Sequence, residues 1–444
     1  MLNCMEENSG IDAIGVRGIY MKQPMTFAVC GFGNRGMEAY AAYAQTCPEQ
    51  MKLVAVADLL PERRQAALEN FGVAPERVFD SAEKLFQAGK LADVLIISTQ
   101  DRDHVPQALQ ALELGYDLIL EKPISPDWDE CIALRDKAVE TGRHVVVCHV
   151  LRYTPFYSAL KRMLTDGAIG KLQTMDAVEH VAYWHQAHSF VRGNWRSSEE
   201  TSPMILAKSC HDMDILRWLA DAPCRALSSF GHLSEFRPEN APEGAPLRCL
   251  DGCPHKDTCP YDAEHIYLDH ETTGFRNGAH GWPVTVLCNG TATEERIYHA
   301  LKTGPYGRCV YHCDNDVVDH QVVAMEFEND VTATFTMTAF TRENRRTIRL
   351  MGTLGEIEAD MLRHEIVYRP FGKSVEHIDC RSVKADGGHG GGDGGLMQAA
   401  FALFSGEAGE ALTDIGASVD SHLMALAAEE SRSHGGKTVV LHQD

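Results

Sequence analysis

The sequence predicts an α/β protein in which a doubly wound parallel sheet is followed by an α+β domain. Short, nearly continuous apolar runs alternate with helical segments up to about residue 150, as in parallel sheets buried on both faces. A glycine-rich turn follows the first of these runs. After Leu151 apolar and polar residues alternate, which favours antiparallel strands with one covered face. The 444 residues also exceed one typical domain.

The first part is expected over residues 25–150. Its predicted strands are TFAVCGF (26–32), KLVAVAD (52–58), ADVLIISTQ (92–100), YDLILEKP (116–123) and HVVVCHV (144–150). Helices are predicted between strands, at NRGMEAYAAYAQ (34–45) and PERRQAALENF (61–71). This alternation indicates βαβ units. Residues 1–24 are predicted to form a poorly ordered N-terminal arm.

The second part is expected over residues 151–444. Residues 322–340 alternate around a Glu-Asn-Asp turn, which predicts an antiparallel hairpin, and residues 346–362 repeat the pattern. Residues from about 235 to 300 are polar and rich in proline, glycine and cysteine, and we interpret them as an insertion. A flexible glycine loop, 387–395, is expected before a closing helix that begins at Leu396.

Composition and charge narrow the classes of function. A chain that is 44% hydrophobic and 23% charged is typical of globular proteins, and its net charge of −22 opposes binding to nucleic acid or to anionic membranes. No apolar run is long enough to span a bilayer, and the N-terminus lacks the features of a secretory signal. We therefore expect a cytoplasmic protein whose 14 cysteines are thiols or metal ligands.

A dinucleotide site is predicted at the first strand. Gly31, Gly33 and Gly36 have the G-x-G-x-x-G spacing between a predicted strand and a predicted helix. Asp58 ends the second strand, where a carboxylate would accept hydrogen bonds from an adenosine ribose. This carboxylate favours NAD, because it would repel the 2′-phosphate of NADP. The neighbouring Arg63 and Arg64 keep NADP as an alternative.

Several further segments resemble one family. They are AVADLLPERR (55–64), ISTQDRDH (97–104), EKPIS (121–125), LRYTPFY (151–157) and ILAKSCHDMDILRWL (205–219), beside GFGNRG (31–36). Together they resemble the glucose–fructose oxidoreductase, inositol dehydrogenase and rhizopine catabolism family, Gfo/Idh/MocA, over about residues 25–235 and 300–430.

The resemblance implies a second domain with an open, mostly antiparallel sheet, whose far face makes a homo-oligomer contact. It also implies hydride transfer between bound NAD and a sugar or cyclitol carbon. The cofactor contacts that it implies, besides the glycines and Asp58, are Asn34, Arg35, Thr99, His104, Glu121 and Lys122.

The catalytic residues expected are Lys122, His211 and Lys208. Lys122 should lie at the carboxyl end of a parallel strand, where its ammonium can polarise a substrate oxygen. The resemblance implies that His211 takes the hydroxyl proton, whereas the alternative is a satisfied core histidine. Family members often have an aspartate at the position of Ala207. Lys208 is the next residue after Ala207 and, on a continuous helix, would share a face with His211 and Asp212. Asp214 and Arg217 are expected only to cap this helix or to form salt bridges on it.

Substrate contacts are expected from the aromatic and basic loop Ala182–Arg196. The residues are Tyr183, Trp184, His185, His188, Arg192 and Trp195, with Asp212 from the following helix. Aromatic rings can stack on sugar faces, and basic groups can bind hydroxyls. Surface positions for His185 and His188 are an equal alternative. His389 and Asp393 would close over the substrate if the glycine loop is a lid, or belong to a tether if it is not.

A structural zinc site is a further hypothesis. Cys249, Cys253 and Cys259 lie close together in the chain, and Cys309 would complete a tetrahedral set, with Cys313 or His255 as alternatives. Such a site would staple an insertion that is too polar to build its own core. Free thiols are the competing interpretation. An iron–sulfur cluster is a further alternative, although the spacing matches none of its usual patterns.

The expected function is an NAD(H)-dependent enzyme acting on a small carbohydrate. It would be either a sugar or cyclitol dehydrogenase or a redox-neutral, NAD-dependent glycoside hydrolase that oxidises C3 transiently, eliminates the aglycone, adds water and returns the hydride. A non-catalytic sensor of NAD(H) or sugar is a more distant alternative.

Overall fold

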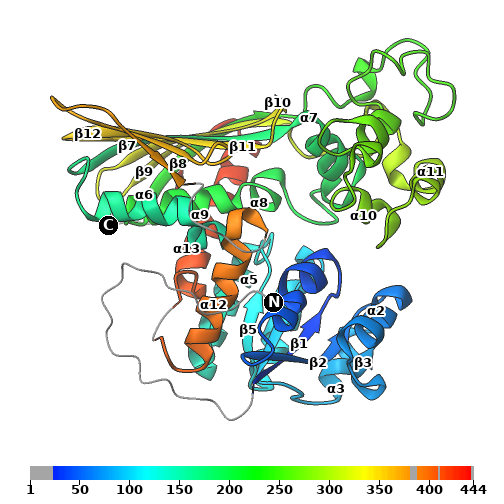
Figure 1. Ribbon diagram of the computed structural model, residues 1–444. Helices are drawn as coiled ribbons and strands as arrows, with labels where there is room; N and C mark the ends of the chain where they lie inside the picture. The colour runs from blue at the N-terminus through cyan, green and yellow to red at the C-terminus, as the bar shows by residue number, and fades with distance from the viewer. Residues whose placement is uncertain (1–23, 381–387, 409–410, 442–444) are drawn as a thin grey trace.

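The computed structural model describes residues 24–380, 388–408 and 411–441. The N-terminal arm expected over residues 1–24 therefore lies outside the described residues, apart from its last position. Two sheets organise the described chain, one in each half of the molecule (Figure 1). No helix within the described ranges is both long enough and apolar enough to cross a membrane.

The first sheet has six parallel strands in the order β3-β2-β1-β4-β5-β6. The strands are β1 (Met25–Cys30), β2 (Met51–Ala57), β3 (Val78–Phe79), β4 (Val94–Ile97), β5 (Asp117–Leu120) and β6 (Val145–Val147). All but the short β3 overlap the predicted apolar runs, and β1 and β2 begin one residue earlier than predicted. The predicted doubly wound parallel sheet is confirmed.

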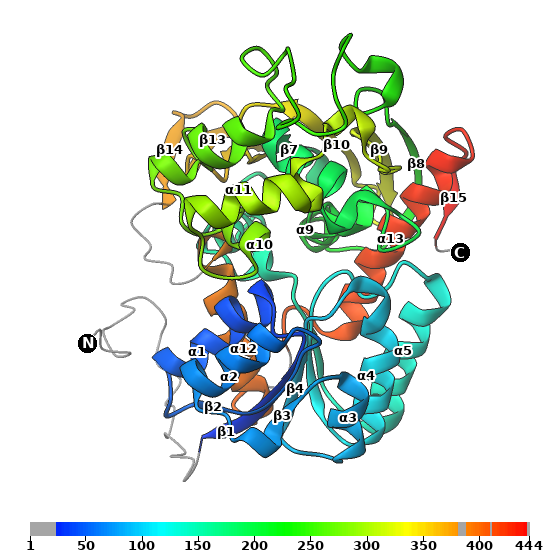
Figure 2. The ribbon, with the colours of Figure 1, turned by 90° about the vertical axis from the view of Figure 1, so that its right-hand side faces the viewer.

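Helices cover both faces of this sheet (Figure 2). One layer contains α3 (Ala82–Gln87), α4 (His104–Glu113) and α5 (Trp128–Thr141). The other contains α1 (Ala42–Thr46), α2 (Pro61–Phe71) and α12 (Gly392–Phe404). The last helix, α13 (Ile415–Ser433), spans both halves: its first turns pack on the α4–α5 layer and its later turns on the second sheet. The chain end thus completes the core of the first half.

The second sheet has nine strands in the order β14-β13-β12-β11-β7-β10-β9-β8-β15. They are β7 (Leu172–Ala182), β8 (Cys224–His232), β9 (His320–Phe327), β10 (Thr332–Thr341), β11 (Arg345–Gly352), β12 (Gly355–Asp360), β13 (Glu365–Pro370), β14 (Glu376–Asp379) and β15 (Val439–Val440). All neighbours are antiparallel except β7 and β10. Both predicted hairpins, β9–β10 and β11–β12, are present.

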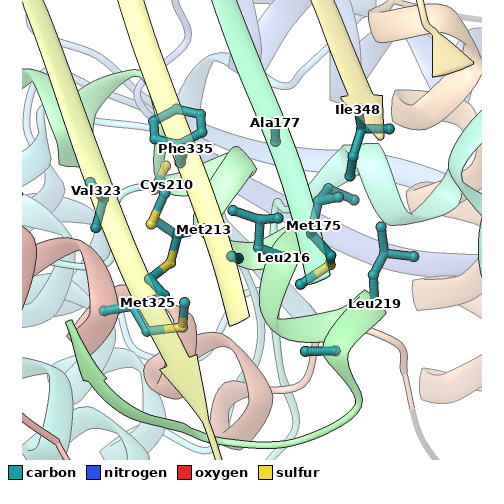
Figure 3. Packing of buried hydrophobic residues seen from close by; sticks show 14 of the residues in the cluster. Met175, Ala177, Cys210, Met213, Leu216, Leu219, Val323, Met325, Phe335 and Ile348 are labelled. Atoms are coloured by element: carbon teal, nitrogen blue, oxygen red, sulfur yellow. The ribbon is translucent and has the colours of Figure 1, made fainter. Parts of the chain in front are cut away.

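One face of the second sheet packs against α6 (Pro155–Thr165), α8 (Met204–Ala207) and α9 (Cys210–Ala220). The contact surface of α9 consists of Cys210, Met213, Leu216 and Leu219, which repeat every third residue. Figure 3 shows them against inward side chains of β7, β9, β10 and β11. Burying each large apolar side chain stabilises the fold by roughly 1.5–3 kcal/mol.

The single helix expected over 205–219 is interrupted. Lys208 and Ser209 leave regular helical geometry, with ψ of 7° at Ser209, so that α8 ends at Ala207 and α9 begins at Cys210. The prediction of one continuous helix was therefore wrong. The break turns Lys208 and His211 towards different neighbours, as described below.

The insertion connects β8 to β9 and so covers residues 233–319, more than the 235–300 expected. It contains α10 (Val284–Cys288) and α11 (Glu294–Thr303), at the upper right of Figure 1. The expectation that it is too polar to build a core was wrong. Its buried apolar residues, including Ile266, Tyr267, Leu268, Ile297 and Leu301, form a separate hydrophobic cluster. The sequence did not reveal this cluster because the apolar residues are dispersed among polar ones.

Candidate active site

The glycine turn after β1 has the close contacts that a dinucleotide site requires. Gly31 has φ of +85°, and a Cβ there would lie 2.4 Å from the carbonyl oxygen of Ser98. A Cβ on Gly36 would lie 2.2 Å from the carbonyl oxygen of Gly31. Both positions therefore require glycine, one for the turn and one for close packing of the following helix. Beside Gly33 the nearest group is the guanidinium of Arg63, which is suited to an anionic ligand.

Asp58 lies directly after β2 and is fixed over this turn. Its carboxylate accepts hydrogen bonds from the backbone N–H of Phe32 at 2.7 Å and of Leu60 at 2.8 Å. Arg63 pairs with the same carboxylate at 3.4 Å. The carboxylate is thus held at the glycine turn with a cation beside it, and its contact with a cofactor ribose stays a prediction.

Arg35 joins the turn to two distant carboxylates. Its Nε lies 2.6 Å from Glu121, and its Nη2 lies 2.8 Å from Asp393 at the start of α12. Tyr40 donates a hydrogen bond to Glu121. Burial alone would raise the pKa of Glu121, but Arg35 and Lys122 outweigh it and lower that pKa. The network is therefore ionised, and it anchors the turn against both the end of β5 and α12.

Asp393 belongs to a helix rather than to a loop. Although α12 was expected to begin at Leu396, it begins at Gly392, where a Cβ would lie 2.3 Å from the carbonyl oxygen of Val150. The glycines thus allow the helix to approach the backbone of Val150 closely. From the composition alone, the same glycines had been interpreted as a flexible loop. Burial opposes ionisation of Asp393, yet hydrogen bonds from His389 and Arg35 lower its pKa.

His104 supports the segment that contains Lys122. Its Nδ1 lies 2.7 Å from the carbonyl oxygen of Pro123, and its Nε2 lies 3.3 Å from that of Thr99. The hydroxyl of Thr99 contacts Gln107 at 3.1 Å. Both ring nitrogens of His104 therefore have protein partners, and its direct contact with a cofactor stays a prediction. Asn34, at the first turn, donates to Glu38.

Lys122 and His211 meet at the boundary between the two halves. The ammonium of Lys122 donates to the carbonyl oxygen of Ala207 at 3.1 Å. His211 is buried, and its Nδ1 has no hydrogen-bond partner within the described residues. Burial, reinforced by Lys122, lowers the pKa of His211 well below its ordinary value. The imidazole is therefore neutral at physiological pH and can accept a proton.

Two further histidines surround this position, and the sequence reasoning missed both. The ring of His149 lies 6.0 Å from His211 and 5.2 Å from His422, between their centroids. Burial lowers the pKa of His149 to about 4. A signal was available for His149, because it lies in the predicted strand 144–150, two residues after the end of β6, and so at the ligand-binding edge of the sheet. His389 completes the group, with its ring 6.0 Å from His211.

Lys208 and Asp212 belong to a second cluster with Glu179 on β7 and Arg346 on β11. Lys208 lies 3.3 Å from Glu179, and Arg346 lies 2.7 Å from Glu179 and 2.8 Å from Asp212. Burial lowers the pKa of Lys208 and raises that of Asp212. Sequence reasoning missed Glu179 and Arg346, although an ionic residue on an otherwise alternating strand was a usable signal. His211 does not share this cluster, contrary to the expected common helix face.

The aromatic loop packs mainly against the insertion. Nδ1 of His188 lies 2.9 Å from the hydroxyl of Tyr267, and burial lowers the pKa of His188 to about 3. His185 contacts Asn344 at 2.9 Å. Both histidines are therefore engaged with protein, which corrects the surface positions considered as an alternative for His188. Tyr183 and Trp184 contact His270 of the insertion through their rings, and Tyr183 stays half-buried.

The end of the loop divides in two directions. Trp195 donates to Asp101, in the segment after β4, at 3.3 Å, which places it beside the first half of the molecule. Arg192 points into the insertion instead and donates to the backbone carbonyls of Arg308 and Tyr261, both at 2.7 Å. This guanidinium is fully buried among protein groups, so the placement corrects the expectation that Arg192 binds a substrate hydroxyl.

The four cysteines expected to bind zinc, Cys249, Cys253, Cys259 and Cys309, line one small cavity of the insertion. As placed, however, no group of three or more histidine, cysteine or acidic side chains in the described ranges could hold a metal ion. All four cysteines are free thiols. The four predicted zinc ligands thus lie around one cavity, but their placement in the described residues does not form a metal site.

Family comparisons agree with this geometry. A model described as an oxidoreductase family with an NAD-binding Rossmann fold matches residues 25–149, and its C-terminal alpha/beta domain matches residues 161–440. The chain belongs to the Gfo/Idh/MocA oxidoreductase family. The resemblance inferred from the sequence motifs is thereby confirmed, and the protein is an NAD-binding oxidoreductase of this family.

Individual relatives show how far the similarity extends. The putative oxidoreductase YteT of Bacillus subtilis is 24% identical over 84% of this chain and 87% of its own length. The inositol 2-dehydrogenase 4 of Saccharopolyspora erythraea is 32% identical over 40% of this chain, and the scyllo-inositol 2-dehydrogenase (NAD(+)) of B. subtilis is 29% identical over 48%. The chain spans about half the length of these two dehydrogenases, at 48% and 59%.

Solved structures of Gfo/Idh/MocA oxidoreductases share the fold. An inositol dehydrogenase homologue from Azotobacter vinelandii, complexed with NADH and myo-inositol, has a TM-score of 0.64 at 16% identity, over 95% of this chain and 99% of its own. The WlbA dehydrogenase of Chromobacterium violaceum, in complex with NADH and UDP-GlcNAcA, has a TM-score of 0.65 at 17% identity, over 95% and 97%. At such low sequence identities, the similarity to these two structures shows a shared fold and nothing more.

Proposed function

We propose that the protein is a dehydrogenase that transfers hydride between NAD and a ring carbon of a sugar or cyclitol. The observation that carries this proposal is the position of Lys122 beside a buried, neutral His211, where the end of β5 meets the broken helix. A nicotinamide ring, when bound, supplies the carbon that exchanges hydride. The names of the inositol dehydrogenase relatives support a polyhydroxylated ring as substrate.

The chain's own residues would handle the proton and the oxygen. His211 would take the proton from the reacting hydroxyl, because its imidazole is neutral and lacks a partner at Nδ1. Lys122 would donate to the same oxygen and stabilise negative charge on it. The Glu179, Arg346 and Asp212 cluster offers hydrogen-bond acceptors and donors for further hydroxyls.

The cofactor residues fit NAD. Gly31 and Gly36 allow the tight turn, and Asp58 is oriented over it by two backbone hydrogen bonds. Arg35, Asn34, Gly33 and Glu121 would line the phosphate and ribose side, with Thr99 and His104 near the nicotinamide end. NAD is therefore the cofactor that we propose.

The test is to incubate purified protein with NAD and a panel of inositols, free sugars and chromogenic glycosides, and to follow NADH absorbance and aglycone release together. NADH that accumulates in proportion to a consumed sugar or cyclitol supports the dehydrogenase. Absence of NADH and of product from the whole panel, with NAD shown to bind, would count against an oxidoreductase acting on such rings.

A redox-neutral, NAD-dependent glycoside hydrolase is the second candidate. The observation that favours it is Lys208, a buried amine whose pKa is lowered, beside Asp212, a carboxyl whose pKa is raised. Transient oxidation at C3 acidifies the C2 proton, and elimination then needs a base in addition to His211. Lys208 could supply it. Aglycone release without net NADH in the same assay would select this candidate.

We also propose a homo-oligomer formed through the second sheet. Figure 1 shows helices along one face of this sheet, and the opposite face carries no covering layer in the described part of the chain. Phe230, Val322 and Phe340 are about half-exposed on it. Exposed apolar side chains on adjacent strands are typical of interaction surfaces. Sedimentation or light scattering of the purified chain would test this, and a monomer at micromolar concentration would contradict it.

A further inference from the structure

Four cysteines of the insertion line one small cavity. Cys249, Cys253, Cys259 and Cys309 line a space of about 20 Å³. A space of this size can hold one occupant of roughly the size of a water molecule. Each thiol in the cavity is a potential soft metal ligand.

The backbone holds two of these cysteines together, although they are far apart in the chain. The N–H of Cys249 donates to the carbonyl oxygen of Gly307 at 3.0 Å, and the N–H of Cys309 donates to that of Leu247 at 2.9 Å. These reciprocal bonds form a short antiparallel bridge. Cys249 and Cys309 are thus preorganised on neighbouring segments, which reduces the entropy lost when both bind one ligand.

The structure also decides among the candidates for a fourth ligand. The Sγ of Cys313 contacts the carbonyl oxygen of Cys309 at 3.3 Å, and Cys313 is not one of the residues that line the cavity. His255 also lines the cavity, and its Nε2 lies 2.8 Å from the carbonyl oxygen of Glu243. Cys309 both lines the cavity and is held beside Cys249 by the backbone bridge, so we take the four sulfurs as the ligands.

A buried cation beside the cavity lacks a counter-charge in direct contact. Arg192 is 1% exposed, its Nη2 lies 3.6 Å from the Sγ of Cys249, and its Nη1 has no hydrogen-bond partner within the described residues. Its other contacts are neutral backbone carbonyls. Asp262 lines the same cavity, but its carboxylate accepts from the backbone of His265 and forms no ion pair with Arg192 in the described structure.

Metal binding would supply that counter-charge. A buried guanidinium is costly unless negative charge lies nearby, and neutral thiols provide none. Four thiolates around a divalent ion carry a net charge of about −2, because each thiol releases its proton to solvent on binding. The same holds in kind for a thiolate-bound iron–sulfur cluster. Four metal-bound thiolates would therefore provide the negative charge that the buried guanidinium of Arg192 lacks in direct contact.

We propose that Cys249, Cys253, Cys259 and Cys309 bind a metal centre through four thiolates, with Arg192 as its buried counter-ion, and that this centre fixes the insertion. The sulfurs line a cavity instead of converging on one point, so they would close around Zn²⁺ at about 2.3 Å each, or move apart to admit an iron–sulfur cluster, which is larger than the cavity. Arg192 lies in the same loop as Trp195, which reaches the segment after β4. The centre would thereby also hold the loop beside the candidate active site.

The first experiment measures metal in the full chain, purified without oxygen from cells supplied with zinc and iron. Elemental analysis that finds about one zinc per chain supports the zinc form. Iron with matching acid-labile sulfide and broad visible absorption supports the cluster form. Less than about a tenth of an equivalent of either metal, together with no uptake of Zn²⁺ or of Fe²⁺ with sulfide by the reduced chain, would overturn the proposal.

Substitutions locate the centre. Cys249→Ser and Cys259→Ser should abolish stoichiometric metal, whereas Cys288→Ser, at another buried thiol of the insertion, should retain it. Arg192→Met leaves all four sulfurs and should weaken metal retention by about 10–100-fold, as loss of an outer-shell partner does. Equal metal content in Cys249→Ser, Cys288→Ser and the unmodified chain would refute the assignment.

A measurement on the unmodified chain guards against variants that fail to fold. Chelation should increase proteolytic cleavage within residues 233–319, and restoring Zn²⁺, or Fe²⁺ with sulfide, should reverse it. The helices of the first half should keep their protection throughout. Cleavage that does not respond to chelation of a metal-loaded chain would contradict the role of the centre in fixing the insertion.

Discussion

The ammonium of Lys122 donates a hydrogen bond to the carbonyl oxygen of Ala207, 3.1 Å away. This contact joins the carboxyl end of β5 to the break between α8 and α9, and so joins the two halves of the molecule at the point where His211 follows. A cation tied by one backbone carbonyl can exchange that partner for a substrate oxygen. The relationship makes Lys122 the most informative residue to change.

Replacing Lys122 by methionine should lower kcat by roughly 10²–10³-fold, because one preorganised donor to the reacting oxygen is lost. The affinity for NAD should change little, since the glycine turn and Asp58 remain. Steady-state NADH formation with the best substrate of the panel provides the measurement. Lys122→Arg, which keeps the charge, serves as the comparison, and activity near the original level in Lys122→Met would exclude a catalytic role.

The pH profile of kcat/KM should lack an acid limb near pH 6.5. Burial and Lys122 lower the pKa of His211, so the free enzyme already has its base in the neutral form at that pH. His211→Gln should reduce kcat by about 10²–10⁴-fold without loss of folding. An inflection near 6.5 that disappears in His211→Gln would show that His211 titrates normally, contrary to this expectation.

Asp58→Asn should shift cofactor preference towards NADP. Removing the carboxylate charge abolishes repulsion of a 2′-phosphate, while Arg63, 3.4 Å from that carboxylate, remains to attract it. We expect the NAD-to-NADP ratio of kcat/KM to fall by about 10–100-fold, or roughly 1.4–2.8 kcal/mol. An Asp58→Asn, Arg63→Met double variant should lose the gain, and an unchanged ratio in both would remove Asp58 from cofactor selection.

Arg35→Met should destabilise the fold by about 1–3 kcal/mol, because it leaves Glu121 and Asp393 without their shared cation. The expected loss of stability is smaller than for a fully buried ion pair, because Arg35 is 28% exposed and solvent screens its charge. Urea unfolding gives the measurement. As a matched control, Arg349→Met removes an exposed pair with Glu356 and should destabilise the fold less than Arg35→Met does. Equal costs would contradict a structural role for the network.

Acidification should destabilise the protein partly through His149. Its pKa is about 4 in the fold and 6.5 ordinarily, so between these values the unfolded chain binds more protons, and stability falls as the pH is lowered through 6.5 towards 4. From pH 7 to pH 5 this contributes about 2 kcal/mol. His149→Leu should lose less stability over that interval by about this amount in urea unfolding. An identical loss in both proteins would disprove the assignment.

The sequence by itself determined five of the six strands of the first sheet and the glycine turn. Continuous apolar runs leave no exposed face, so they require helices on both sides, and the glycines at 31 and 36 are sites where any side chain would collide with backbone. Strand alternation likewise determined the β9–β10 and β11–β12 hairpins, because a period of two specifies which face is buried. Motif spacing was also sufficient to identify the family.

Only the tertiary structure decided which distant groups meet. Asp393 lies 358 positions from Arg35, Glu179 reaches Lys208 from β7, and Arg346 reaches Asp212 from β11, so no local pattern encodes these pairs. Helical spacing placed Lys208 and His211 on one face, but the break at Ser209 separated them. The sequence predicted that Arg192 binds a sugar hydroxyl. In the structure its side chain packs into the insertion, beside the cavity that the four cysteines line. Local periodicity is set by neighbours in the chain, whereas burial and charge pairing depend on elements that come together only on folding.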